Sequence, residues 1–486
     1  MHQLAPVLTV LGGVLMMFGL AMCVPLGFAM TGSDAAVEAF AGSAAITFAV
    51  GALMFGVFRR WHRRELQPRD GFLLVALVWS VLPAFGAMPL MFQLPGLSFT
   101  DAFFEAASGL TTTGSTVLTG LERLPTSINV WRCFMVLIGG MGILVLAVAI
   151  LPLLGVGGSQ LFKAETPGPM KDDKLTPRIA ETARGLWSVY FASALACLLA
   201  YRLTGMHWTD AFMHMCSTMG LGGFAAYDAS FGAFNSPLIE AVAIFFMLLA
   251  GVNFALYFVA WRKRSLAVLW RDVEARWFLG VMGGAVLLVA GFLTAHGVYP
   301  SFGESLRHAA FSVVSIATTT GFATVDYAQW PAFAPALMLF LCCFATCAGS
   351  TGGGIKMARV LLLVKAARSE LIRIVHPRAV TPVSLAGAAV DARVLQSVLA
   401  FMMIYGAVIV GATLVLLFTG LDMVTAFTAV LASINNTGPG LGEVGPAANY
   451  QGLSDIQTWV CSIVMLLGRL ELLSVMVLLT PAFWRR

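Results

Sequence analysis

The sequence contains few charged residues. Asp, Glu, Lys and Arg make up 11% of the 486 residues, whereas soluble globular proteins carry roughly 25%. A soluble protein of this length would lack the polar surface it needs, so that class is excluded. Apolar residues account for 59% of the chain and occur in long runs, each close to or above the ~20 residues with which a helix crosses a bilayer. The clearest runs are Phe72–Phe92, Cys133–Leu154, Leu238–Trp261, Phe278–Ala295 and Leu395–Phe418.

Cysteine and histidine form no cluster with a metal-ligand or catalytic spacing. Nearly all of the eight cysteines lie within apolar segments, where a thiol behaves as a small hydrophobic group. Their spacing fits neither a zinc site nor a disulfide framework. The seven histidines are scattered along the chain, so no set of catalytic groups is expected at one depth of the membrane. An enzyme is therefore disfavoured.

The basic residues alternate between the two sides of the predicted membrane. The net charge is +5, and every second connection carries a basic cluster. These clusters are Arg59–Arg69, Lys163–Arg184, Arg262–Arg276, Lys365–Arg378 and Arg485–Arg486. The other connections hold few basic residues, chiefly Arg123, Arg132, Arg202 and Arg307. This positive-inside pattern predicts that the basic clusters and both termini are cytoplasmic, and it explains the net charge without a nucleic-acid partner.

The pattern of apolar runs predicts ten helical spans. The first apolar stretch, Leu4–Met30, is longer than the apolar region of a signal peptide and has no basic start, so we interpret it as a retained helix. The spans are 5–30, 41–58, 71–92, 130–155, 184–203, 236–261, 276–297, 332–368, 393–419 and 455–483. The first two form a hairpin, and the other eight form four pairs that each enclose an apolar outer loop.

The four outer loops resemble one another. Each begins with an acidic residue, continues through a short apolar helical stretch and ends in a run of small residues that contains glycine. Gly220–Asp228 aligns without a gap with Thr318–Asp326. The acidic residues are Asp101, Asp210, Glu304 and Asp422, and the equivalent glycines are Gly114, Gly223, Gly321 and Gly438. Successive glycines are 109, 98 and 117 residues apart, and repetition at a nearly fixed period indicates a repeated structural unit.

This repetition predicts an all-α polytopic membrane protein. It would contain four pseudo-repeated helix–pore loop–helix units around one pore, together with an N-terminal two-helix hairpin. The predicted units are the hairpin at 1–64, repeat 1 at 65–160, repeat 2 at 161–270, repeat 3 with an intramembrane loop at 271–380, and repeat 4 at 381–486.

The repeated loops have the properties of an ion filter. Each is too short to cross the bilayer twice and too apolar for water, and irregular backbone at membrane depth must be buried in protein or line a wet cavity. Around one axis, peptide carbonyls after each short helix can replace the water shell of a cation. Leu221 has no hydroxyl to offer, so binding would use main-chain oxygen. Close helix packing through small residues is the alternative, which the shared acidic start and glycine disfavour.

Two further features lie on the cytoplasmic side of this filter. The span 332–368 contains the glycine-rich segment 348–356, which a continuous helix would not favour. A phosphate loop is disfavoured because the glycine–lysine spacing is wrong and no strand precedes it, so we expect a flexible intramembrane plug or hinge, with a plain helix kink as the alternative. Arg469 lies inside the last span, where an ionisable residue marks a functional position. It would face the pore and oppose cation passage, since pairing with Glu471 would join two different helix faces.

Eight segments carry a resemblance to a known family. They are SGLTTTGST (108–116), GGMGI (139–143), PRIAETARGLW (177–187), STMGLGGFAAYD (217–228), TTTGFATVDY (318–327), AGSTGGGIK (348–356), NNTGPGLGEVGP (435–446) and GRLELLSVMVLLTPAFWR (468–485). With these segments the chain resembles the Trk/Ktr/HKT superfamily of potassium transporters, specifically the bacterial TrkH type. The N-terminal helix pair favours the TrkH branch over the Ktr branch.

The resemblance implies a role for particular residues. The implied filter comprises Thr111, Thr112, Thr113, Gly114, Gly220, Leu221, Gly222, Gly223, Thr318, Thr319, Thr320, Gly321, Asn435, Asn436, Thr437 and Gly438. Potassium would bind the carbonyls of the first two residues of each motif, namely Thr111, Thr112, Gly220, Leu221, Thr318, Thr319, Asn435 and Asn436. The implied gate comprises Gly349, Ser350, Thr351, Gly352, Gly353, Gly354, Lys356 and Arg469.

The resemblance also implies the cellular setting. Family members are homodimers in the bacterial inner membrane and assemble with a separate cytosolic nucleotide-binding subunit of the TrkA type. Potassium would be the substrate, with no covalently bound cofactor, and membrane lipid would surround the spans. The membrane potential supplies about 2.3 kcal/mol per charge per 100 mV, which corresponds to about fifty-fold accumulation. A proton- or sodium-coupled carrier is the alternative, although carriers usually use inverted repeats and these four repeats run in one direction.

Overall fold

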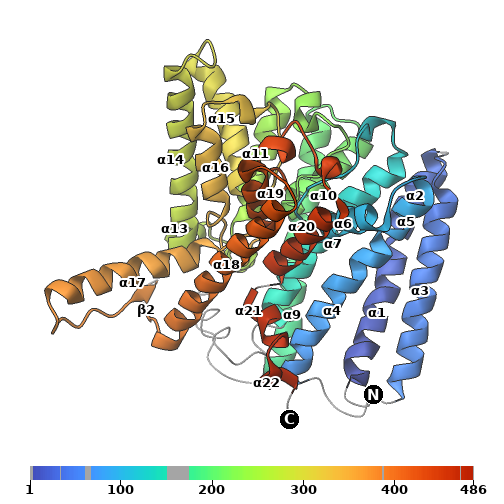
Figure 1. Cartoon of the computed structure of the whole chain (residues 1–486), viewed down its shortest axis with the longest axis horizontal. Helices are drawn as coiled ribbons and strands as arrows, with labels where there is room; N and C mark the ends of the chain where they lie inside the picture. Colours follow the sequence, from blue (N-terminus) through green and yellow to red (C-terminus); the bar gives the residue numbers. More distant parts are fainter. Residues whose placement is uncertain are drawn as a thin grey trace.

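The protein is a bundle of helices (Figure 1). The computed structural model describes residues 4–32, 34–60, 67–149, 175–385, 388–470 and 472–484. Among these residues the only strands are β1 (Ser384–Leu385) and β2 (Ala388–Ala389), which pair antiparallel. Most of the basic cluster Lys163–Arg184, the end of the predicted span 130–155, Glu471 and Arg485–Arg486 lie outside the described residues.

The N-terminal hairpin is held together by glycines. It consists of α1 (Ala5–Ala21), α2 (Cys23–Gly32) and α3 (Val37–Arg59). A Cβ added to Gly12 would lie 2.7 Å from the Phe55 nitrogen, and one added to Gly51 would lie 2.7 Å from the Met16 nitrogen. The backbones of α1 and α3 therefore approach each other as only glycine permits, a common way to pack helices in membranes.

The rest of the chain forms four units, and each has a short helix between two longer elements. Repeat 1 contains α4 (Pro68–Gly86), α5 (Met88–Gln93), α6 (Phe99–Leu110) and α7 (Thr126–Ala149). Repeat 2 contains α9 (Leu175–Leu203), α10 (Trp208–Gly220), α11 (Pro237–Gly251) and α12 (Phe254–Lys263). Repeat 3 follows α13 (Ala267–Arg271) and contains α14 (Val273–Ala295), α15 (Phe302–Ala317), α16 (Phe333–Cys342) and α17 (Met357–Val375). Repeat 4 contains α18 (Ala392–Phe418), α19 (Met423–Asn435), α20 (Asp455–Arg469), α21 (Leu472–Leu478) and α22 (Pro481–Trp484).

The short helices α6, α10, α15 and α19 gather in the half of the molecule away from α22 (Figure 1). Their starts are fixed by local capping, in which a side chain accepts hydrogen bonds from amides of the first helical turn. Ser98 accepts from the Asp101 amide, and Ser301 accepts from the Glu304 amide. Asp422 itself caps α19, where hydrogen bonds from Thr425 and the Val424 amide hold the pKa of its carboxyl below the usual range. Three of the acidic starts therefore belong to these caps. In α10 the cap is His207, and the Asp210 carboxylate instead accepts a hydrogen bond from the Tyr227 hydroxyl.

Three predicted spans are not continuous helices. The span 236–261 bends by 89° between α11 and α12, where Asn253 caps the second helix. The span 332–368 ends as α16 at Cys342, and α17 extends sideways from the bundle (Figure 1). The span 455–483 is divided into α20, α21 and α22. Hydropathy alone misses the breaks in 236–261 and 455–483, because both sides of each are apolar, whereas the glycine-rich segment had indicated the interruption of 332–368.

Eight of the ten predicted spans coincide with candidate membrane-crossing helices in the described part of the chain. Six helices are long and apolar enough to cross a membrane, or up to eight if each bent pair forms one span. The prediction of ten also included 130–155, which runs beyond the described residues, and the interrupted span 332–368. One basic residue assigned to the outer connections is also misplaced, because Arg132 lies in α7 and is fully buried.

The glycine contact in the hairpin gives a first prediction. Gly51→Val should lower the free energy of unfolding by about 2 kcal/mol, because the added atoms overpack a backbone contact. Gly56→Val, in the same helix but with open space around its Cβ position, should change it by less than about 0.5 kcal/mol. Denaturant titration of the purified protein in detergent measures both. Equal effects would show that the close approach of α1 and α3 is not required.

Candidate functional site

Four equivalent motifs follow the four short helices. We call them motif 1 (Thr111–Gly114), motif 2 (Gly220–Gly223), motif 3 (Thr318–Gly321) and motif 4 (Asn435–Gly438). Almost all of their residues are buried, and Gly114, Gly223 and Gly321 are partly exposed. The sixteen residues predicted for the filter therefore lie in four matching positions of the fold.

The motifs form a closed ring. A Cβ added to the glycine of one motif would overlap a backbone carbonyl oxygen of the next motif. In each case this oxygen belongs to the residue just before the glycine of that next motif. The pairs are Gly114 with Gly222, Gly223 with Thr320, Gly321 with Thr437, and Gly438 with Thr113. Motif 1 thus contacts motif 2, and so on until motif 4 contacts motif 1. The four repeats surround one axis in chain order, and the sequence-predicted glycines are the points of contact.

All four motifs share one unusual backbone conformation. The second residue of each has a left-handed φ, which is 55° at Thr112, 53° at Leu221, 61° at Thr319 and 54° at Asn436. A β-branched residue such as threonine rarely adopts this region. The next amide in each motif donates to a carbonyl five residues earlier, at 2.7–3.1 Å, as in the helix-ending turn that normally uses glycine. Such strain persists only where the surrounding structure fixes it, typically at functional sites.

Hydrogen bonds behind the ring fix the motif side chains. Thr111 and Thr113 share a hydroxyl contact of 2.7 Å, and Thr318 and Thr320 share one of 2.8 Å. These contacts leave the side chains of these four threonines engaged with protein. The Asn436 amide group donates to the Thr113 hydroxyl at 3.0 Å and so joins motif 4 to motif 1.

The carbonyl oxygens of the motifs are available to a ligand. Among the described residues, no protein hydrogen bond ends on the carbonyls of the first two positions of any motif. Those positions are Thr111, Thr112, Gly220, Leu221, Thr318, Thr319, Asn435 and Asn436. Buried backbone carbonyls are nearly always paired, so eight unpaired ones in one ring constitute a candidate cation site whose oxygen ligands suit a hard ion.

The glycine-rich segment lies directly against this ring. It occupies residues 343–356 between α16 and α17, and so begins earlier than the predicted 348–356. The Gly353 amide donates to the Thr319 hydroxyl at 2.8 Å, and the Thr351 hydroxyl donates to the Met219 carbonyl at 3.0 Å. A Cβ added to Gly353 would overlap the Asn435 carbonyl oxygen, so only glycine fits there.

The remaining predicted gate residues surround the same segment. Lys356 donates to the Gly352 carbonyl, and Ser350 donates to the Cys347 carbonyl at 2.6 Å. Gly349 and Gly354 have left-handed φ values of 73° and 81°. These contacts and turns fold the segment back on itself.

Arg469 lies beside this segment and is buried. Its guanidinium donates to the Thr351 carbonyl at 3.0 Å and to the Gly139 carbonyl at 3.3 Å, and only 1% of the residue is exposed. The arginine thus joins α20 to both the glycine-rich segment and α7. Glu471, which was considered as its partner, lies outside the described residues.

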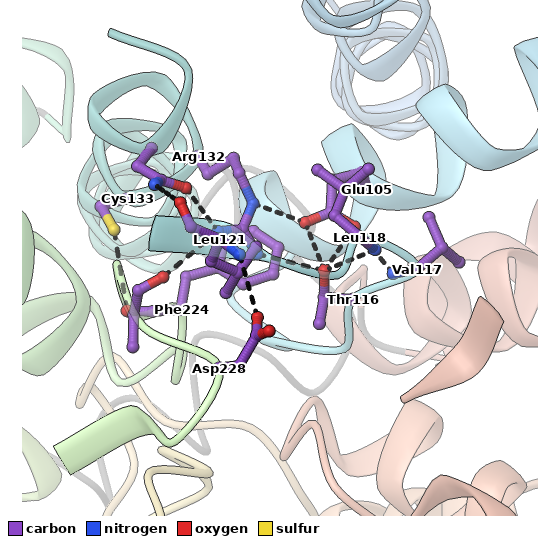
Figure 2. Close-up of polar contacts among 11 residues, drawn as sticks. Glu105, Thr116, Val117, Leu118, Leu121, Arg132, Cys133, Phe224 and Asp228 are labelled. Carbon is purple, nitrogen blue, oxygen red and sulfur yellow. Dashed lines mark hydrogen bonds and ion pairs between the residues drawn. The ribbon is translucent and has the colours of Figure 1, made fainter. Parts of the chain in front are cut away.

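Sequence reasoning missed three residues that support the site. Glu274, at the start of α14, accepts hydrogen bonds from the amides of Ala348 at 2.7 Å and Ala358 at 3.1 Å, one on each side of the glycine-rich turn. Glu105 and Arg132 form an ion pair behind motif 1 (Figure 2). The available signal was a carboxylate inside an apolar helical stretch, at 105.

The fold and the site together define a helical membrane transport protein with four re-entrant units. The family model described as TrkH, cation transport protein, matches residues 37–486 of the chain. The chain therefore belongs to the TrkH family of cation transport proteins. This confirms the resemblance that the sequence motifs carried.

Individual relatives match over nearly the whole chain. The Trk system potassium uptake protein TrkH of Halomonas elongata is 45% identical over 485 residues, which cover 100% of both chains. The protein of that name from Escherichia coli K12 is 45% identical over 477 residues, 98% of both chains. The crystal structure of the potassium transporter TrkH from Vibrio parahaemolyticus superposes with a TM-score of 0.92 at 42% identity, covering 99% of this chain and 100% of that one.

These similarities bear on two predictions. The structural match confirms the predicted fold class, an all-α polytopic membrane protein. The relatives are named as transporters, in agreement with the expectation that this chain is not an enzyme.

The ring contacts give a second prediction. Gly321→Ala should lower the free energy of unfolding by more than about 2 kcal/mol, because a left-handed φ costs a residue with Cβ about 1–2 kcal/mol and the added atom also meets the Thr437 carbonyl. Gly297→Ala is the control, since its φ is 63° but its Cβ position is open. This variant should lower the free energy of unfolding only by the cost of the left-handed φ. Denaturant titration of both variants measures the difference, and equal losses would contradict tight contact between motifs 3 and 4.

Proposed function

We propose that the protein takes up potassium across the bacterial inner membrane through the ring of motifs 1–4. The observation that carries the proposal is the set of buried, unpaired carbonyls at the same two positions of each motif. These are Thr111 and Thr112, Gly220 and Leu221, Thr318 and Thr319, and Asn435 and Asn436. Carbonyl oxygens in a ring can replace the hydration shell of potassium. The names of the relatives, which are potassium uptake proteins, support the choice of this ion.

The glycine-rich segment and Arg469 would form the gate of this pathway. The segment 349–354, with Lys356 after it, lies beside the ring, and the Gly353 amide contacts the Thr319 hydroxyl of motif 3. A buried guanidinium at the same level repels a desolvated cation strongly because the local dielectric constant is low. Conduction would therefore require the segment to move away from the ring and Arg469 to shift or be neutralised by other groups.

The setting of the transporter is part of the same proposal. The starts of α1 and α4 and the helix α22 lie at one end of the molecule (Figure 1), which supports termini on one side, the cytoplasm by the charge pattern. We further propose a homodimer that binds a separate cytosolic nucleotide-binding subunit of the TrkA type. The hairpin 1–64 and the units 65–160, 161–270, 271–380 and 381–486 would act as its functional parts.

The transport proposal predicts a specific flux. Rubidium should enter proteoliposomes loaded with potassium, driven by outward potassium movement, and should not enter vesicles loaded with sodium only. Gly321→Ser should abolish uptake, or should allow uptake into sodium-loaded vesicles as well, because the added side chain meets the Thr437 carbonyl. Uptake that depends strictly on a proton gradient would favour the coupled carrier instead. No uptake by the protein, even with residues 348–354 deleted, would contradict the channel proposal.

The gate proposal predicts the effect of charge at position 469. Arg469→Gln should raise the initial rubidium uptake rate threefold or more, because the repulsive charge is lost while an amide donor to the Thr351 carbonyl remains possible. Arg469→Lys keeps the charge and serves as the control, with a rate within twofold of the unsubstituted protein. Parallel initial-rate measurements in the same vesicles test this. A Gln variant no faster than the Lys variant would exclude an electrostatic role.

A further inference from the structure

One ion pair is fully buried beside the ring of motifs. Glu105 lies in α6 and Arg132 in α7, and the Arg132 Nε lies 2.7 Å from a Glu105 carboxylate oxygen (Figure 2). Both side chains are 0% exposed. Burying such a pair costs desolvation that its attraction often does not repay, so its presence is weak evidence for a stabilising role. A role in fixing geometry accounts for it better.

Hydrogen bonds attach this pair to the chain that leaves motif 1. The Thr116 hydroxyl donates to the Glu105 carboxylate at 2.9 Å, and the Val117 amide donates to it at 3.0 Å. The Arg132 guanidinium in turn donates to the Thr116 hydroxyl at 3.1 Å. Figure 2 shows Thr116 between the two charged groups. The segment after Gly114 is therefore held by both members of the pair.

The same guanidinium also contacts the chain that leaves motif 2. It donates to the Ala225 carbonyl at 3.2 Å and lies over the Phe224 ring, 4.4 Å from its centre. Thr116 is the second residue after Gly114, and Ala225 is the second residue after Gly223. Arg132 thus connects equivalent positions of two neighbouring repeats, directly behind the contact of Gly114 with motif 2.

Next to the motif glycines, the links found at two other junctions use neutral groups. An ion pair, Arg307–Glu240, also joins repeat 3 to repeat 2, but its arginine side chain is 30% exposed. In the described residues, the Ser115 hydroxyl donates to the Gly438 carbonyl at 2.9 Å between repeats 1 and 4. The Gly232 amide donates to the Ala323 carbonyl at 3.2 Å between repeats 2 and 3. Counted back from the motif glycines, the positions equivalent to Glu105 are His214, Ser312 and Ala429. Only repeat 1 has a carboxylate there, so this feature belongs to one of the four junctions between motifs, which we call the corners of the ring.

We propose that Glu105 and Arg132 are positioning residues that hold motifs 1 and 2 at a fixed separation and thereby set the discrimination between potassium and sodium. This inference rests on the proposed potassium pathway. Discrimination depends on the number and arrangement of carbonyl oxygens around the ion. If the 1–2 junction relaxes, the carbonyls can close on the smaller sodium ion, and the preference for potassium falls.

The test replaces the pair by apolar side chains of similar size, Glu105→Leu with Arg132→Met. Such replacement of a buried pair usually preserves folding, whereas a single neutralisation leaves one charge unpaired. Rubidium uptake is measured with increasing external sodium, and the sodium concentration that halves uptake is the readout. This concentration should fall tenfold or more in the double variant. An unchanged value would overturn the inference.

Two further variants separate positioning from general stability. Thr116→Val leaves the ion pair intact but removes the hydroxyl that both members hold, and it should lower the half-inhibiting sodium concentration about threefold. The control is the less buried pair Arg307–Glu240, 2.6 Å apart between α15 of repeat 3 and α11 of repeat 2, replaced by Arg307→Met with Glu240→Leu. It should change the readout less than twofold.

The outcomes distinguish this inference from the transport proposal. No rubidium uptake by the unsubstituted protein would overturn both. Normal uptake with sodium sensitivity unchanged in both the Thr116→Val and the Glu105/Arg132 variants would overturn only the positioning role. An equal loss of discrimination in the Arg307/Glu240 variant would also overturn it, since the effect would then follow from any lost ion pair.

Discussion

Peptide carbonyls held inside a membrane without hydrogen-bond partners raise the free energy of the folded protein, and every repeat carries this cost at the end of its short helix. The left-handed residues Thr112, Leu221, Thr319 and Asn436 add conformational strain to it. Four capped helices, four glycine contacts and the hydroxyl pairs behind the motifs hold this arrangement together. The surrounding helices can be understood as the support that makes an otherwise unfavourable backbone persist. In the proposed pathway, a bound cation would supply the missing partner of these carbonyls.

The sequence predicted the parts of this arrangement that repeat. Four acidic starts, four apolar stretches and four glycines at a period near 110 residues identified the loops and the residues that meet in the ring. The break at Asn253 was not predictable, because apolar residues continue on both sides. The glycine-rich segment 348–356 did indicate an interruption of the span 332–368, but not that the helix already ends at Cys342. The Glu105–Arg132 pair escaped notice because charge counting assigns an arginine near a span end to the outside. Only tertiary packing shows that it turns inward to meet a carboxylate.

The glycine-rich segment is anchored at its ends by neighbouring elements. The Glu274 carboxylate accepts hydrogen bonds from backbone amides on both sides of the turn. The Cys347 amide donates to the Gly251 carbonyl of repeat 2 at 3.0 Å. The middle, Gly352–Gly354, has no side chains and is held by backbone hydrogen bonds alone, among them that of the Gly353 amide to the Thr319 hydroxyl. A segment of this kind can change shape between fixed ends at low cost, and the helices that carry its ends, α14 and α17, are the elements through which a cytosolic partner could act.

The ring closes within one polypeptide, and its four corners are chemically different. In an assembly of identical chains, one codon change alters every corner at once, so selectivity moves in large steps. Here a mutation at Thr116 or Arg132 changes one corner and leaves three intact. Evolution can therefore adjust the ion preference of such a protein in small increments, and can keep one corner rigid while another, beside the glycine-rich segment, is adapted for opening.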